Sequence, residues 1–166
     1  MAIRLNADDF WEFSLALYCR EAVANACLSL QDRRGADVNL LLAICWLARS
    51  GYAVNDAALE SGLVATASWS ESVLRPLRAV RRSVASFAEV NANDRQSIKH
   101  GLLAVELEAE RVSQQKIVAA LAEHMNRLST EPARHVAAVG LDLYAIKLSA
   151  GEPQDRADLD TILGAL

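Results

Sequence analysis

The fold is decided by one stretch of the sequence, 38-VNLLLAICWLA-48, which follows the polar turn 31-QDRRGAD-37. Every residue from Leu40 to Ala48 is apolar, so a helix made from this stretch has no face suited to water and has to be covered on all sides. The run is much shorter than the roughly 20 apolar residues needed to cross a membrane. It therefore predicts the central helix, at about residues 38–50, of a helical domain.

The composition of the whole chain favours an all-α fold. The 166 residues include only three prolines and seven glycines, and apolar residues make up 52%. A chain of this length is expected to form one domain, residues 1–166, and to bury roughly 70% of the surface that it exposes when unfolded. No alternation of apolar and polar residues with period two, the pattern of a strand, is present. We therefore predict a single-domain bundle of seven or eight helices around the apolar central helix.

Capping residues and breaks divide the rest of the chain into further helices. Asn6 and Asp155 are predicted to cap the first and last helices, and Pro132 to open another that runs to about Ala150. After a short helix that ends near Leu63, residues 65–68 are expected to form a loop. A helix then begins at Trp69, and Pro76 predicts a kink or a restart near Arg75. The other predicted helices span about residues 21–33 and 94–128.

Charge and cysteine content narrow the functional classes. The net charge of -4 lacks the basic footprint of a nucleic-acid-binding protein, so we do not expect a nucleic-acid partner. The three cysteines show no CxxC spacing and lie in apolar contexts, which predicts free, buried thiols in a reducing compartment. The N-terminal residues do not resemble a signal peptide. These features predict a cytoplasmic protein that does not enter a membrane.

Two segments resemble a known family: 10-FWEFSLALY-18 and 30-LQDRRGADVNLLL-42. They are similar to the opening of a family of short bacterial proteins classified only as a domain of unknown function, and 106-ELEAER-111 also fits that pattern. The resemblance implies a small, mostly bacterial, helical protein. It implies no activity, substrate or catalytic residue.

A candidate ligand site lies on the long predicted helix. Glu106 and Glu110 are four residues apart, so they share one helix face, between two apolar stripes. Half-buried carboxylates need compensation by a cation, a metal or protonation. Arg75, Arg78 and Arg82 recur on one helical face and are the obvious cations, with Arg81 beside them. The pattern fits either an ion-pair network that joins two helices or a site in which these side chains bind an anionic ligand or a divalent cation.

Asn39 is a further candidate for ligand binding. It projects on the same side of the central helix as Ala43 and Trp46, which predicts a buried, hydrogen-bonded amide. Asp37 precedes it and is expected to cap the helix. The free backbone N–H groups of a helix start can hold an anion.

Two functional hypotheses follow, and the sequence leaves open whether the protein is an enzyme. No nucleophile elbow, phosphate-binding loop or dinucleotide-binding motif is present, and no cofactor or metal is predicted. The first hypothesis is a non-enzymatic protein that acts through protein–protein contact, as an adaptor or a homodimer. Its contacts would involve Trp69 and the second stripe of the long helix, Leu103, Leu107, Ile117 and Leu121, opposite the first stripe of Ile98, Leu102, Val105, Ala109 and Val112. The alternative is a small-molecule or phosphate-binding protein or enzyme, with or without a metal ion, that uses Glu106 and Glu110 with the arginine face.

Overall fold

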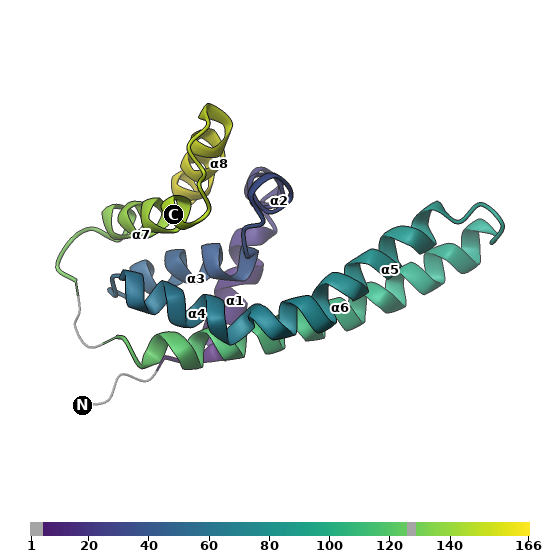
Figure 1. Ribbon diagram of the computed structural model, residues 1–166, viewed down its shortest axis with the longest axis horizontal. Helices are drawn as coiled ribbons and strands as arrows, with labels where there is room; N and C mark the ends of the chain where they lie inside the picture. Colours follow the sequence, from purple (N-terminus) through teal and green to yellow (C-terminus); the bar gives the residue numbers. More distant parts are fainter. Residues whose placement is uncertain (1–4, 126–128) are drawn as a thin grey trace.

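The computed structural model describes residues 5–125 and 129–166, and these residues form an all-α structure without strands (Figure 1). It contains eight α-helices, which confirms the predicted fold class and helix number. A short π-helical turn, η1, joins α4 to α5. The elements are α1 (Ala7–Tyr18), α2 (Glu21–Arg34), α3 (Val38–Arg49), α4 (Asp56–Trp69), η1 (Ser70–Leu74), α5 (Arg75–Ser86), α6 (Ala92–Ala122), α7 (Ala133–Lys147) and α8 (Pro153–Gly164).

Helix α3 is the buried centre of the domain, as predicted. Every side chain from Asn39 to Ala48 is buried, and α1, α2, α6 and α7 all pack against α3. The carboxylate of Asp37 accepts hydrogen bonds from the backbone N–H groups of Asn39 and Leu40, at 2.9 and 3.4 Å, so it caps the helix as expected. The rings of Phe10 and Trp46 stack with their centroids 5.0 Å apart. Helices α1, α2, α6 and α7 therefore form a cover around α3.

The cysteine prediction is only partly correct. All three thiols are free, and Cys27 and Cys45 are buried, but Cys19 is exposed at the end of α1. Burial raises the pKa of both Cys27 and Cys45 to about 12. These two thiols are therefore neutral core residues rather than nucleophiles.

A cluster of ion pairs fastens α8 to α2. The guanidinium of Arg33 pairs with Asp155 and Asp158, and that of Arg34 also pairs with Asp155, at 2.8 Å. Asp155 is not the N-cap that the sequence predicted. Glu152 occupies that position, and the buried Asp155 carboxylate accepts its backbone N–H at 3.0 Å. The side chain of Asp155 is thus needed for binding α2 as well as for starting α8.

The chain between α3 and α7 forms one long helical hairpin. The predicted loop at residues 65–68 is wrong, because α4 continues through it to Trp69. The predicted break near Arg75 takes the form of η1, after which Pro76 lies in the first turn of α5, where a missing N–H costs little. Helix α6 returns alongside and ends at Ala122, while 126–128, the last predicted residues of that helix, lie outside the described residues.

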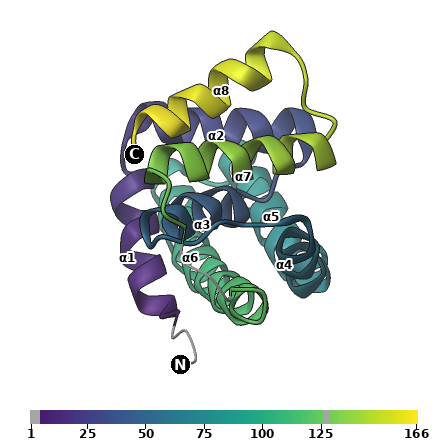
Figure 2. The same ribbon diagram turned by 90° about the vertical axis from the view of Figure 1, so that its left-hand side faces the viewer.

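The long hairpin, residues 56–122, has two unlike sides. Helices α1, α2, α3, α7 and α8 gather on one side, near the start of α4 and the end of α6 (Figures 1 and 2). Helix α5 and the first half of α6 extend beyond this body as an arm, in which α5 packs chiefly against α6 and η1. Among the described residues, no helix covers the opposite side of the hairpin. No helix in the described part of the chain is both long and apolar enough to span a bilayer.

The contact of α7 with α3 gives a test of the central packing. A Cβ atom at Gly140 would lie 2.6 Å from Cγ2 of the buried Ile44. We expect Gly140→Ala to lower the free energy of unfolding by about 1–3 kcal/mol, because the rigid, β-branched Ile44 cannot move away. Gly164→Ala is the control, since nothing lies within 4 Å of its Cβ position. Equal stability of the two variants in chemical denaturation would contradict this packing.

The contact of α8 with α2 predicts a pH dependence. The hydrogen bond from Arg34, helped by Arg33 and the Glu152 N–H, lowers the pKa of Asp155 to about 2. An unfolded aspartate titrates near about 3.9. The lowered pKa means that Asp155 stabilises the fold above about pH 4, and that this stabilisation disappears as the pH falls toward about 2.

The measurement is the difference in unfolding free energy between wild type and Asp155→Asn at several pH values. We expect the difference to be largest near neutral pH and to shrink between about pH 4 and about pH 2. Asp160→Asn, at an exposed ion pair with Arg156, should show only a small difference throughout. A pH-independent loss in Asp155→Asn would contradict the assignment.

Candidate functional site

A polar cluster lies where α3, α5 and α6 meet, and it contains three of the predicted residues. The Asn39 amide donates a hydrogen bond to Oε2 of Glu110 at 2.5 Å and accepts one from Gln114 at 3.0 Å. Arg78 forms an ion pair with Oε1 of Glu110. Both carboxylate oxygens of Glu110 are therefore engaged within the chain. Asn39 is buried and hydrogen-bonded, as predicted.

A second ion pair lies farther along the arm. Glu106 is buried and pairs at 2.5 Å with Arg81, not with one of the three predicted arginines. Arg75 instead pairs with Glu71 one turn away, with both side chains more than 60% exposed, and Arg82 is exposed. Only Arg78 of the predicted set thus reaches the glutamates. The periodicity could not separate Arg81 from Arg82, because both lie within about 60° of Arg78 around the helix.

Asp37 adds a negative charge near this cluster. Its other carboxylate oxygen accepts a hydrogen bond from Thr66 at 3.3 Å, and its backbone N–H donates to the Tyr144 hydroxyl at 2.8 Å. Burial, together with the nearby charge of Glu110, raises the pKa of Asp37. Asp37 and Glu110 therefore bring two carboxyl groups close together inside the protein.

Together, these polar contacts hold neighbouring helices together. The ion pairs Arg78–Glu110 and Arg81–Glu106 join α5 to α6, and the hydrogen bond from Asn39 to Glu110 joins α3 to α6. The described residues contain no group of three side chains suited to hold a metal ion. Two buried polar atoms, Ser113 Oγ and Gln114 Oε1, have no hydrogen-bond partner within the described structure. A ligand role for Arg75, Arg78, Arg82, Glu106, Glu110 and Asn39 stays a prediction.

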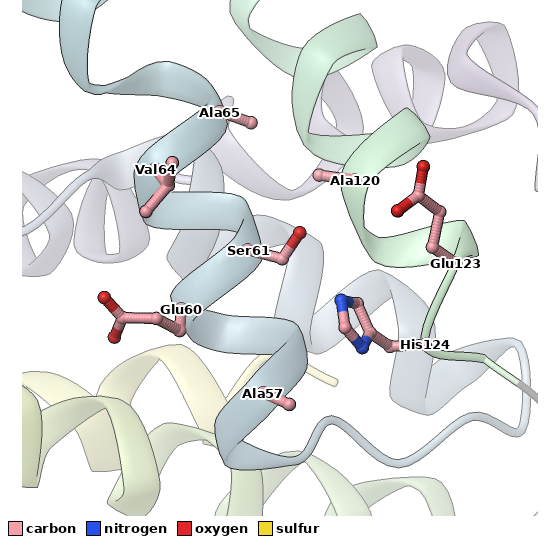
Figure 3. Close-up of a pocket in the computed structure, with 8 residues that line it drawn as sticks. All are labelled: Ala57, Glu60, Ser61, Val64, Ala65, Ala120, Glu123 and His124. Carbon is pink, nitrogen blue, oxygen red and sulfur yellow. The ribbon is translucent and has the colours of Figure 1, made fainter.

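The side of the hairpin away from α3 carries a different feature, an open groove of about 520 Å³ between α4 and the end of α6 (Figure 3). Small side chains line it: Ala57, Ser61 and Ala65 from α4, and Ala120 from α6. Val64, 69% exposed, lies beside them. Glu60, Glu123 and His124 complete the lining. The groove presents a mostly uncharged floor with acidic groups beside it.

Apolar stripes continue this side of the hairpin along the arm. In α5, spacings of three and four residues place Leu77, Val80 and Val84 on a single helix face. Val73 in η1 and Phe87 just after α5 extend this stripe at its two ends. On α6, the predicted first stripe has the same spacing. Helical geometry places both stripes on the same side of the antiparallel pair, opposite Gln114 and α3. We call these two stripes the outer face.

The side chains of this outer face are partly exposed to solvent. Val80, Phe87, Ile98 and Val105 are each about half exposed, whereas Ala109, where the stripe reaches Trp69, is buried. The indole N–H of Trp69 donates to the Ala109 carbonyl at 2.9 Å. In the second stripe of α6, Ile117 and Leu121 belong to the core, and Leu103 and Leu107 are about half exposed.

The α5 half of the outer face was not predicted from the sequence. The 4-3-4-3 spacing was visible from Val73 to Phe87, but the predicted loop and the break at Pro76 hid the fact that this helix runs beside α6. That arrangement depends on tertiary contacts.

Comparison with known proteins finds one family. A family model described as "Protein of unknown function (DUF2390)" matches residues 9–117, more than half of the chain. The match spans α1 to most of α6, and so includes the polar cluster and the outer face. No curated protein and no solved structure matches the chain.

The polar cluster makes a testable contribution to stability. Glu110→Gln keeps the shape of the side chain but leaves Arg78 without its charged partner. We expect a loss of about 1–3 kcal/mol in unfolding free energy, typical of a charged hydrogen bond in a partly buried setting. Glu71→Gln, which breaks an exposed pair on the same arm, should cost less than about 0.5 kcal/mol. Similar losses in the two variants would show that the cluster does not fasten the arm.

Proposed function

The chain belongs to this family of proteins of unknown function, and we propose that it acts without catalysis, by binding another protein through the outer face of its long hairpin. The observation that carries the proposal is the uncovered pair of apolar stripes on the arm. Single exposed apolar residues are ordinary on protein surfaces, but a contiguous apolar face is typical of an interaction site. This proposal refines the adaptor-or-dimer hypothesis by moving the interface from the second stripe of α6 to the first.

The orientation of side chains in the arm supports the proposal. The pairs Arg78–Glu110 and Arg81–Glu106 lie between α5 and α6, whereas Val80 and Val105 lie outside. An isolated helical hairpin gains more by placing apolar side chains between its helices, since inward ion pairs lose much of their energy to desolvation. Placing the apolar side chains outside is favourable when a partner protein covers them and removes them from water.

The shape of the apolar stripes indicates the kind of partner. Spacings of four and three residues along a straight helix pair are those of helices that pack side by side with other helices. We therefore propose a helical partner that lies along the arm. The absence of a basic surface on this face agrees with a protein rather than a nucleic acid. The cytoplasm is the compartment that we propose for this interaction.

The alternative, a ligand-binding or catalytic role for Glu106 and Glu110, receives less support. Both oxygens of Glu110 already accept hydrogen bonds within the chain, and Glu106 is buried against Arg81. A metal or phosphate would have to displace these partners and bear the cost of separating buried charges. We therefore favour a structural role for these residues and protein contact as the function.

Site-specific photocrosslinking tests the proposal. A photoreactive phenylalanine analogue at Ile98, on the outer face, should give covalent adducts of increased mass in cells that make the protein naturally. The matched control is Leu103, which is equally exposed, 50% against 47%, on the opposite side of the same helix. Adducts at Leu103 alone would return the interface to the second stripe. Absence of adducts at both Ile98 and Val80 would overturn the proposal.

A further inference from the structure

The side of the hairpin that bears the outer face is large enough for a complete protein interface. Each stripe of the outer face spans 14 residue steps, about 21 Å by helix geometry, and continuing along α6 from Ala92 to Val118 lengthens the surface to about 40 Å. With a width of about 20 Å for the antiparallel helix pair, that corresponds to about 800 Å² on each partner, the area of a standard stable complex. A single additional helix would cover only half of it. Two antiparallel helices with matching stripes would cover all of it, and the chain itself possesses such a pair.

The residues of α6 are arranged with approximate symmetry about Val105. Ile98 and Val112, both in the first stripe, are equidistant from Val105 in the sequence. Asp94 and Lys116, both exposed and on the same side of α6, are also equidistant from it. When two α6 helices pack antiparallel with Val105 opposite Val105, each Asp94 lies at the level of the other copy's Lys116. The opposite charges are then complementary.

Gly101 is a third observation that points to the same arrangement. It lies in the interior of α6, where glycine destabilises a helix by roughly 0.5–1 kcal/mol relative to alanine. Among the described residues, no atom lies within 4 Å of its Cβ position, so no contact in that part of the chain requires a glycine there. It projects at the edge of the outer face, and its symmetry-related position is that of the small Ala109. A small residue there allows close approach of a second helix.

We infer that the outer face binds a second copy of this chain, packed antiparallel about a two-fold axis near Val105, so that the two arms form a four-helix bundle. The interface is isologous, with the same stripes contributed by both copies. The helical bodies lie at opposite ends and on the far sides of the bundle, so they do not collide. The inference rests on the proposed function and names its partner.

The oligomeric state of matched variants tests the inference. Sedimentation velocity over a concentration series should show a wild-type dimer. Val105→Glu introduces two carboxylates at the axis and should weaken dimerisation by at least about 100-fold, because unpaired buried charges are costly. Leu103→Glu adds the same charge at a residue of similar exposure, 50% against 53%, on the other side of α6 and should leave the dimer intact. Circular dichroism checks that both variants are folded.

A disulfide experiment tests the register without relying on a disruptive variant. Val105→Cys, in a Cys19→Ser background that removes the exposed thiol, should form a dimer linked by a disulfide on mild oxidation with copper phenanthroline. Leu103→Cys in the same background should remain largely monomeric on a non-reducing gel. Equal crosslinking of the two variants would overturn the antiparallel register.

The failure of this inference differs from the failure of the proposed function. A wild-type chain that is monomeric throughout the concentration series overturns the second copy as partner. If the photoreactive residue at Ile98 then gives adducts with a different protein, the outer face remains an interface. If it gives none, both conclusions are overturned.

Discussion

The structure depends on the need to cover α3 on every side. Ten consecutive buried residues, from Asn39 to Ala48, require neighbours around the whole circumference of the helix. Helices α1, α2, α6 and α7 meet that requirement, and α8 packs chiefly against α2. The position of each of these helices follows from the apolar surface that it can offer to the centre. Even Gly140 fits this view, since it allows α7 to approach Ile44 closely.

The need to cover α3 ends where α3 ends, but the long hairpin continues beyond that point. Helix α6 has 31 residues, but only its second half has a place beside the centre. The first half and α5 lie beyond the body, where the apolar cover of α3 no longer determines which residues face inward. There the interior of the hairpin contains ion pairs, and Leu74 is the buried apolar residue on the α5 side. The change from apolar to charged packing marks the boundary between the part that maintains the fold and the part available for contact.

The sequence could predict the central helix α3 but not how the helices of the long hairpin pack against one another. An unbroken apolar run, a capping aspartate and a buried asparagine specify α3, because each depends on neighbours within a few residues. The continuation of α4 through residues 65–68 could not be predicted in this way, since Ala65, Thr66, Ala67 and Ser68 are tolerated in both helices and loops. Contact with α6 decides it, including the hydrogen bond from Trp69 to Ala109. The choice of Arg81 over Arg82 also depends on how α5 and α6 pack, which no local pattern records.

The candidate glutamates illustrate how a sequence motif can describe an interaction without identifying its purpose. Glu106 and Glu110 do require cations, as their half-apolar surroundings predicted, and Arg81 and Arg78 supply them. This arrangement keeps α5 beside α6 at a place where apolar packing between them is weak. It also frees Val80 and Val105 to face outward on one side. Because ion pairs hold α5 and α6 together on the inside of the arm, its apolar residues remain available on the outside. The polar cluster and the outer face therefore both result from the way in which α5 packs against α6.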